Sequence, residues 1–452
     1  MPDLDPNLAL SGSDDLLAPF HAAEKERARW RVGAEAEKFG VYRDDGKPVD
    51  FAGPRGVRTI LSLLEERHGW HPHREVQGGE VIALQRDGAS ITLEPGAQLE
   101  LSGAPLETVH ETHAELVGHR AELADVSEEL GIAWLGMGFH PLATQEELPW
   151  VPKLRYAIMR RYLPTRGAHG LDMMRRTATV QANFDYSDEA DAVRKLRIAL
   201  RLSPLVTALF ANSPFKEGRD AGDQSVRARV WLDVDPDRSG LLPFAAREGE
   251  LGYADYIEWA LDAPMFMLRR GDQVVHNTGQ TFRDYMAHGF EGERATFGDW
   301  ETHLNTLFPE VRLKRTLEVR GADSLSTEMS CALPALWKGV LYEPGALDAA
   351  EAFSREIDID ELLAVREDIA HRALGAQLGG RPVAEWAREL LAISRAGLEK
   401  LACLDEQGRD EALYLEPLGA LAHDGLCPAD LLRERVKPGE HFLEGLLQHA
   451  QL

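Results

Sequence analysis

The sequence predicts an α+β fold built on a curved antiparallel β-sheet of about six strands, with one apolar and one polar face. Five segments between residues 30 and 320 alternate apolar and polar residues, as strands with one buried face do. From residue 348 onward the periodicity is instead that of helices. We therefore expect one domain over residues 1–345, in which helices flank the sheet. An all-helical C-terminal extension over residues 346–452 should pack on it.

The first alternating segment, residues 30–42, carries Glu35 and Glu37. Side chains alternate between faces along a strand, so both carboxylates point the same way, about 7 Å apart. Like charges held so close repel each other unless a cation lies between them, and Mg²⁺ is a suitable cation because it prefers oxygen ligands. Taken alone, the pair is weak evidence for a metal, because solvated carboxylates commonly protect the edge of a sheet.

The other four segments repeat the alternation. Residues 90–102 form two alternating runs around a Pro95–Gly96 turn, which predicts a hairpin. Residues 177–186, 226–233 and 315–320 each read as a single strand. The polar positions of these four segments hold acids, amides and arginines: Glu94, Gln98, Glu100, Gln181, Arg227, Arg229, Glu318 and Arg320.

A sheet face that mixes acids with arginines suits a metal-bound polyphosphate. Carboxylates bind the cations, and the cations and guanidinium groups together neutralise phosphoryl oxygens. The alternative is a solvated sheet face with ion pairs along it. No glycine-rich loop ends in Gly-Lys-Ser or Gly-Lys-Thr, so any ATP must bind without a P-loop.

Several motifs resemble those of the plant-type glutamate-cysteine ligases. They include Gly-Ala-Glu-Ala-Glu-Lys-Phe-Gly at 33–40, Leu-Gly-Met-Gly-Phe-His-Pro at 135–141 and Ala-Leu-Phe-Ala-Asn-Ser-Pro-Phe at 208–215. Residues 90–108, 170–174, 308–315 and 317–323 are similar to the same family, whereas residues 346–452 match only loosely. The resemblance implies that residues 1–345 are a catalytic domain. It also implies a reaction in which ATP phosphorylates the γ-carboxylate of glutamate and the amine of cysteine displaces phosphate, giving γ-glutamylcysteine, the first step of glutathione biosynthesis.

The resemblance also implies roles for individual residues. Arg227 is similar to the arginine that binds a substrate carboxylate, and Arg320 to the one that reaches the phosphates of ATP. For either arginine, a structural ion pair with a nearby acid is the alternative. Gln181 stands where related bacterial enzymes have a histidine ligand, and an amide oxygen binds Mg²⁺ more weakly. The expected metal ligands are Glu35, Glu37, Glu94, Glu100, Gln181 and Glu318.

Residues 151–176 reverse the sign of the local charge. The whole chain has a net charge of −25, but this segment holds seven Lys or Arg residues and a single acid, Asp172. Such a segment attracts anions. With Pro164, Gly167 and Gly170, it predicts a mobile loop between a short helix and the strand at Thr177. We expect this loop to cover bound nucleotide, with Arg160 among the ATP contacts. Ion pairs with the acidic surface are the alternative reading.

Composition limits the partners. The strong negative charge argues against nucleic acid, and the longest apolar stretches are too short to span a membrane. Three widely spaced cysteines and an N-terminus that is neither basic nor apolar lead us to expect a cytoplasmic protein. The expected ligands are glutamate, cysteine, ATP and Mg²⁺, and the protein should be a monomer or homodimer.

Two other function classes stay open from the sequence. A γ-glutamyl ligase with another amine acceptor, or one that serves ergothioneine synthesis, would keep the same carboxylates and Arg320 and differ only in the acceptor pocket. A non-catalytic metabolite sensor on the same scaffold would be expected to have lost some metal ligands, yet none of the five glutamates is missing.

Overall fold

A nine-stranded sheet forms the centre of the computed structural model, which describes residues 5–271 and 273–452. Residues 1–4, which are part of the N-terminal segment used to expect a cytoplasmic protein, lie outside the described residues. The strand order is β14 (Val311–Leu313), β15 (Leu317–Asp323), β7 (Thr179–Phe184), β1 (Val32–Tyr42), β5 (Leu99–Ser102), β4 (Ala89–Leu93), β3 (Val81–Arg86) and β2 (His71–Arg74), with β6 (Ile132–Leu135) paired to the far end of β1. All neighbours are antiparallel. This confirms the predicted fold class, with more strands than the expected six.

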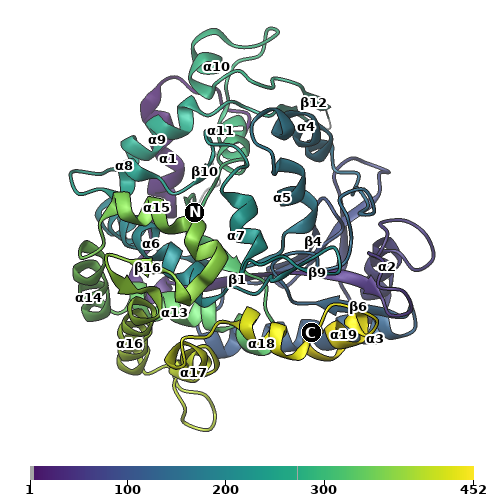
Figure 1. Cartoon of the computed structure of the whole chain (residues 1–452). Helices are drawn as coiled ribbons and strands as arrows, with labels where there is room; N and C mark the ends of the chain where they lie inside the picture. Colours follow the sequence, from purple (N-terminus) through teal and green to yellow (C-terminus); the bar gives the residue numbers. More distant parts are fainter. Residues whose placement is uncertain (1–4, 272) are drawn as a thin grey trace.

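The two faces of the sheet have different neighbours. In Figure 1, α4 (Leu154–Tyr162), α5 (Gly170–Arg176), α7 (Val226–Trp231) and α11 (Phe297–Leu304) lie above the sheet. Below it lie α3 (Val109–Glu128), α13 (Ala332–Tyr342) and the last helices of the chain. Elsewhere, α2 (Val57–His68) packs on β3, and α6 (Glu189–Leu209) packs on β14 and β15.

The strand register separates apolar from polar residues. Ala36 of β1 is opposite Leu101 of β5, which is opposite Ile91 of β4, so these apolar side chains form one row on the lower face. Lys38 is the exception on this face: it is buried, and burial lowers its pKa to about 7. The carboxylates at alternate positions of β1 occupy the upper face.

Residues 226–233 do not form the strand that their alternation predicts, because Val226–Trp231 is the helix α7. The hydroxyl of Ser225 caps the helix by accepting a hydrogen bond from the backbone N–H of Ala228 (2.9 Å). Val226 and Val230 then lie one turn apart and are both buried, so the same residues satisfy a helical pattern. A short apolar run of this kind fits either period.

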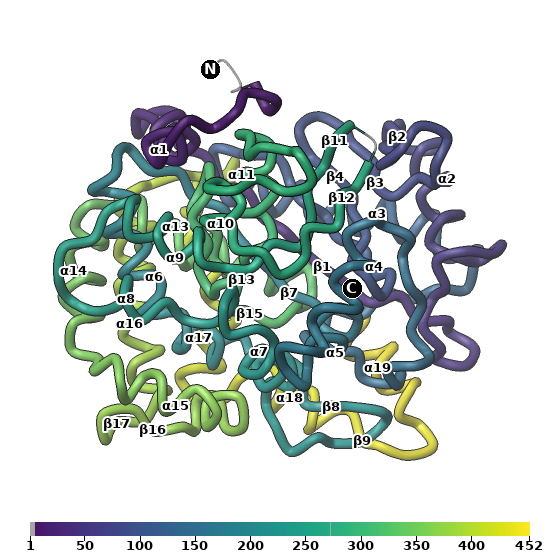
Figure 2. Tube along the Cα trace, turned by 90° about the horizontal axis from the view of Figure 1, so that it is seen from above, coloured from purple at the N-terminus to yellow at the C-terminus, as the bar shows by residue number. Residues whose placement is uncertain are grey.

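One end of the molecule, opposite the β2–β3 edge, is formed by α14 (Pro344–Arg355), α15 (Ile359–Arg372), α16 (Val383–Leu401) and α17 (Glu416–His423), with the short hairpin of β16 (Gln377–Leu378) and β17 (Arg381–Pro382) (Figure 2). The last two helices, α18 (Pro428–Arg435) and α19 (Phe442–His449), lie below the sheet instead, and α19 packs on β6. α16 packs on α13, and Lys338 of α13 forms a buried ion pair with Glu411 (2.7 Å). No helix of the described residues is both long and apolar enough to cross a bilayer.

The remaining elements lie around the sheet. They are α1 (Ser13–Ala23), α8 (Pro243–Ala246), α9 (Tyr253–Asp262), α10 (Phe282–His288) and α12 (Thr327–Ser330), with the short pairs β8 (Phe215–Lys216) with β9 (Arg219–Asp220), β10 (Ser239–Gly240) with β13 (Phe308–Pro309), and β11 (Leu268–Arg270) with β12 (Gln273–Val275). α1 packs on α9.

Thr108 begins α3 with a capping box. Its hydroxyl accepts from the backbone N–H of Glu111 (3.1 Å), whose carboxylate accepts from the backbone N–H of Thr108 (2.9 Å). Thr108→Ala should lower the free energy of unfolding by about 1 kcal/mol, measured by urea denaturation. Thr108→Ser keeps the hydroxyl and should lose much less; equal losses in the two variants would show that the cap contributes nothing.

Candidate active site

Strand pairing brings the predicted carboxylates together on the upper face of the sheet. Glu37 of β1 lies directly opposite Glu100 of β5, and Glu35 lies opposite Gln181 of β7. Glu94 follows the last residue of β4. We call Glu35, Glu37, Glu94 and Glu100 the carboxylate cluster. Together with Gln181, Arg227 and Arg320, they line a cavity of about 580 Å³.

The carboxylate cluster is a group of acids that no nearby cation contacts closely enough to stabilise in the ionised form. None of its four members forms an ion pair within 4.0 Å in the described part of the chain. Burial, reinforced by Glu318 and Glu100, raises the pKa of Glu35 to about 8. Burial and the repulsion of neighbouring members likewise raise the pKa of Glu37 and of Glu94. Acids whose ionised forms lack a counter-charge are suited to a cation, which would take the place of their protons.

Neutral donors fix the orientation of three members of the cluster. Glu35 accepts a hydrogen bond from the side-chain amide of Asn183 (2.8 Å), and Glu37 accepts one from the backbone N–H of Thr179 (2.9 Å). Glu100 accepts one hydrogen bond from the hydroxyl of Thr92 on the neighbouring strand β4 (2.6 Å) and one from the hydroxyl of Ser102 on its own strand (2.9 Å). Each carboxylate therefore keeps oxygen lone pairs for a further ligand.

The donor set fits Mg²⁺ bound together with a phosphate ligand. All four side chains offer oxygen, which hard divalent cations prefer. In the described residues, no three His, Cys, Asp or Glu side chains are already grouped to hold one ion. Mg²⁺ commonly uses only one or two carboxylates and completes its shell with water and substrate phosphates. The cluster therefore suits cations that arrive with a polyphosphate better than a cation held by protein alone.

The raised pKa of Glu35 predicts a pH dependence of stability. Its carboxyl keeps its proton in the folded state up to about pH 8, but loses it near the ordinary value of 4.5 when unfolded. The stability contributed by this group is therefore full below about pH 4.5 and is lost as the pH rises to about 8. Glu35→Gln stays neutral, so in metal-free buffer its Tm relative to the parent should increase from about pH 5 to pH 8. A Tm difference that stays constant over this range would contradict the shift.

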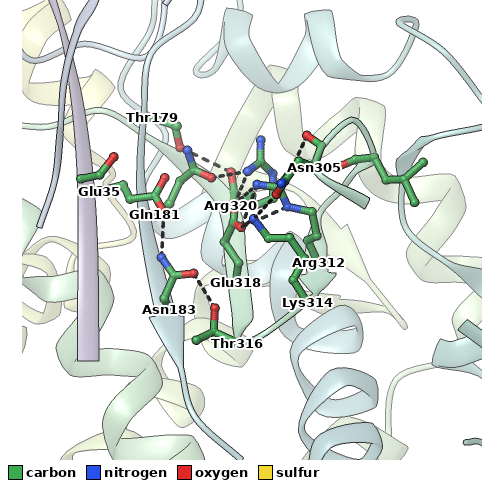
Figure 3. A network of polar contacts seen from close by, with 12 residues as sticks. Glu35, Thr179, Gln181, Asn183, Asn305, Arg312, Lys314, Thr316, Glu318 and Arg320 are labelled. Atoms are coloured by element: carbon green, nitrogen blue, oxygen red, sulfur yellow. Dashed lines mark hydrogen bonds and ion pairs between the residues drawn. The ribbon is translucent and has the colours of Figure 1, made fainter. Parts of the chain in front are cut away.

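Glu318 differs from the carboxylate cluster because cations already surround it (Figure 3). Arg312 forms a bidentate contact with both carboxylate oxygens (2.8 Å each), Lys314 lies 3.1 Å away, and Arg320 also contacts the group. Although burial alone would raise the pKa of Glu318, these cations hold it well below the usual range. As the side chains stand, Glu318 orients Arg320 and is not free to bind a metal; as a ligand it would have to exchange these partners.

Arg227 and Arg320 lie next to each other in the cavity wall. Arg227 is only 4% exposed, and its guanidinium donates to the backbone carbonyl of Arg320 (2.7 Å). No carboxylate lies within 4.0 Å of Arg227 in the described chain, and its Nε has no hydrogen-bond partner. Arg320 donates to both Glu318 and Gln181. A buried guanidinium without an acidic partner is well suited to a substrate carboxylate.

Residues 151–176 are more helical than predicted. The expected short helix is present as α4, but the segment between it and Thr177, predicted as a mobile loop, contains a 3₁₀ turn at Leu163–Thr165 and the helix α5. Arg160 is exposed and lies over the ring of Trp150, 4.6 Å from its centre, and it does not line the cavity. The structure thus does not bring Arg160 to the carboxylate cluster. Arg155 and Arg160 are five residues apart in α4, so their side chains differ in direction by about 140° around the helix axis. Arg155 therefore faces the cavity while Arg160 faces away from it.

Sequence reasoning gave no role to three cations of the site. Arg155 and Lys153 line the cavity beside the carboxylate cluster, and Arg312 holds Glu318. Arg155 and Lys153 were visible as members of the basic segment, although their orientation depended on the helical phase. Arg312 lies in the 308–315 motif, one strand before Glu318, and the β14–β15 pairing places it directly opposite that residue.

Residues 31–449 match the family model described as glutamate-cysteine ligase family 2. The chain belongs to this family. It is 42% identical over 422 residues to glutamate–cysteine ligase B, chloroplastic, of Oryza sativa subsp. japonica, covering 93% of this chain and 83% of the relative. It is 40% identical to the chloroplastic glutamate–cysteine ligase of Arabidopsis thaliana, covering 93% and 79%.

A solved structure supports the fold. The glutamate–cysteine ligase of Francisella tularensis, in complex with AMP, superposes with a TM-score of 0.58 and 13% identity, covering 93% of this chain and 87% of the other. The comparisons confirm the resemblance predicted from the motifs. They contradict the expected cytoplasmic location, because the plant relatives of this chain are named as chloroplastic.

Proposed function

We propose that this protein joins glutamate to cysteine at the expense of ATP, producing γ-glutamylcysteine, ADP and phosphate. The observation that supports this most strongly is the carboxylate cluster, which shares one cavity with Arg227 and Arg320 in a member of glutamate-cysteine ligase family 2. Glutathione biosynthesis requires this product as its first dipeptide. The division into a catalytic domain over 1–345 and a C-terminal extension is part of the same proposal.

The reaction transfers the γ-phosphoryl group of ATP to a carboxylate oxygen of glutamate. Both reactants are anions, so positive charge at the reacting groups lowers the barrier. Magnesium bound by the carboxylate cluster would supply Lewis acidity and charge neutralisation at the phosphates. Arg320, fixed by Glu318 and Gln181, presents its guanidinium to the same cavity. Arg155 and Lys153 add cations on the opposite wall, from the start of α4.

Arg227 is placed to bind a carboxylate of the amino-acid substrate. Its burial means that it exchanges little water when the substrate binds, and it has no acidic partner to give up. A guanidinium fixed in this way orients the substrate for in-line attack on the γ-phosphorus. The acyl phosphate that forms is then attacked by the amine nitrogen of cysteine. The new C–N bond forms as the C–O bond to phosphate breaks, and the amine releases a proton.

The cavity wall protects the acyl phosphate from water. Apolar surface is contributed to this cavity, whose floor is charged, by Tyr156 and Met159 of α4, Trp231 of α7, Met267 just before β11, and Phe308 of β13. Exclusion of water limits hydrolysis of an activated acyl group before the amine arrives.

The test supplies purified protein with ATP, Mg²⁺, glutamate and a panel of amines, and identifies the products by mass spectrometry. We expect γ-glutamylcysteine, with ADP and phosphate formed in equal amounts. A clear preference for another amine would show that this amine, and not cysteine, is the acceptor. The absence of ADP formation with every amine would contradict ligase activity and favour a non-catalytic, metabolite-sensing role.

A further inference from the structure

A second cavity lies on the opposite face of β1 from the carboxylate cluster. It measures about 460 Å³ and is bounded by β1, α3, β6 and the segment that follows β15. Its lining is mainly apolar, including Leu116 and Leu123 of α3, Trp134 of β6 and Leu325. Glu37 and Lys38 are adjacent in β1, and successive side chains of a strand point to opposite faces of the sheet. The carboxylate of Glu37 therefore faces the first cavity and Lys38 faces the second. Nothing in the proposed ligase reaction uses this second cavity.

Lys38 contributes an ammonium group to this apolar surrounding. The residue is only 4% exposed, and its Nζ donates to the backbone carbonyl of Ala36 (3.1 Å) and to Nε2 of His119 (3.2 Å). When Lys38 is protonated, its third N–H has no acceptor, and no carboxylate lies within 4.0 Å of Nζ among the described residues. Burying a cation without a counter-charge is costly, and an apolar side chain at this position would avoid that cost.

His119 adds a second unsatisfied group at the same end of the cavity. It is 4% exposed, and since its Nε2 accepts from Lys38, its proton resides on Nδ1. Nδ1 has no hydrogen-bond partner in the described chain. Two arginines also line the cavity. Arg43 is exposed, donates to the carbonyl of Ile132 and to Gln451, and forms no ion pair within the described residues, whereas Arg120 is already paired with Glu328. The acid Glu128 is also exposed among the lining residues.

We propose that this cavity is a binding site for a small amphipathic monocarboxylate. The carboxylate would accept the free proton of Lys38, and the apolar body would lie among Leu123, Trp134 and Leu325. A volume of about 460 Å³ is in the usual range of small-molecule sites. One buried ammonium matches one negative charge, whereas a polyphosphate would require several cations around it.

The occupied cavity would contact the strand that carries the carboxylate cluster. Ser324 lines the cavity, and its hydroxyl donates to the backbone carbonyl of Glu37 (2.5 Å). Lys38 follows Glu37 directly in β1. A ligand held at Lys38 therefore contacts the part of β1 whose backbone positions Glu37 on the opposite face of the sheet.

Isothermal titration calorimetry with 4-phenylbutyrate and 4-phenylbutan-1-ol tests the charge of the site. We expect one molecule of the acid to bind per chain. Lys38→Met should lower the affinity for the acid at least tenfold and change the affinity for the alcohol by no more than about twofold. Lys47→Met, the same exchange at an exposed lysine, should bind the acid like the parent. Failure of the parent to bind the acid, or equal affinity in the parent and Lys38→Met, would overturn the proposal.

A second variant tests the position of the site without changing a buried residue. Ala124 lines the cavity from an exposed position of α3, so Ala124→Trp should obstruct it while the protein still folds. We expect this variant to lose at least tenfold in affinity for 4-phenylbutyrate. Ala121→Trp, at an exposed position of the same helix outside the cavity, is the control and should bind normally. Undiminished binding by Ala124→Trp would place the probe elsewhere and refute the assignment.

Discussion

Glu35→Gln should lower kcat by at least about 10³-fold, equivalent to about 4 kcal/mol of transition-state stabilisation. Glu35 is a half-buried member of the carboxylate cluster, and its carboxylate accepts a hydrogen bond from Asn183 that an amide oxygen could also accept. The substitution therefore removes one negative charge and weakens a metal ligand with little change in packing. Steady-state ADP release at saturating ATP, glutamate and cysteine measures the effect.

The same variant should remain folded. Ionised Glu35 is repelled by Glu318 and Glu100, so neutralising it should leave the free energy of unfolding within about 2 kcal/mol of the parent. Glu65→Gln, the same exchange at an exposed position of α2, should have normal turnover. Full activity of Glu35→Gln would remove Glu35 from the metal site.

Arg227→Met should lower kcat/KM for glutamate by about 10²- to 10³-fold, because a buried charge-assisted contact to a carboxylate is lost. The long apolar side chain of methionine fills most of the volume of the arginine. No ion pair within 4.0 Å is broken, and the nearby Asp323 keeps hydrogen bonds from Asn212, Ser213 and Ser225. The free energy of unfolding should therefore change by less than about 2 kcal/mol.

Arg229→Met is the matched control for Arg227→Met. Arg229 lies two residues further along α7, is partly exposed, and pairs with Asp223 and Glu367 away from the cavity. Its loss should leave kcat/KM for glutamate within about twofold. If both variants retain parental kinetics, Arg227 does not bind substrate; if both lose activity equally, the effect belongs to the helix and not to the guanidinium group.

The polar face of the sheet could be predicted because strand periodicity fixes which side chains share a face. Alternation alone placed Glu35 with Glu37 and Glu94 with Glu100, and the register then set Glu37 against Glu100. Pairing partners so far apart along the chain are not contained in local sequence. For this reason the sequence alone could not establish that the four carboxylates meet in one cavity; the strand order was needed.

The side chains whose orientation depends on tertiary contacts were harder to predict. Residues 226–231 fit both a strand and a helix, and the cap at Ser225 together with burial of Val226 and Val230 selects the helix. Glu318 has the correct strand position for a metal ligand, but Arg312 comes from the adjacent strand to hold it. Arg160 belongs to a basic segment near the cavity, and the phase of α4 turns it away.

Anomalous X-ray diffraction from crystals grown with Mn²⁺ in place of Mg²⁺, together with a non-hydrolysable ATP analogue, tests the central claim most directly. The account predicts anomalous peaks inside the cavity, each at coordination distance from at least one carboxylate of Glu35, Glu37, Glu94 or Glu100 and from a phosphate oxygen of the nucleotide. Mn²⁺ and nucleotide bound away from all four of these glutamates would contradict it.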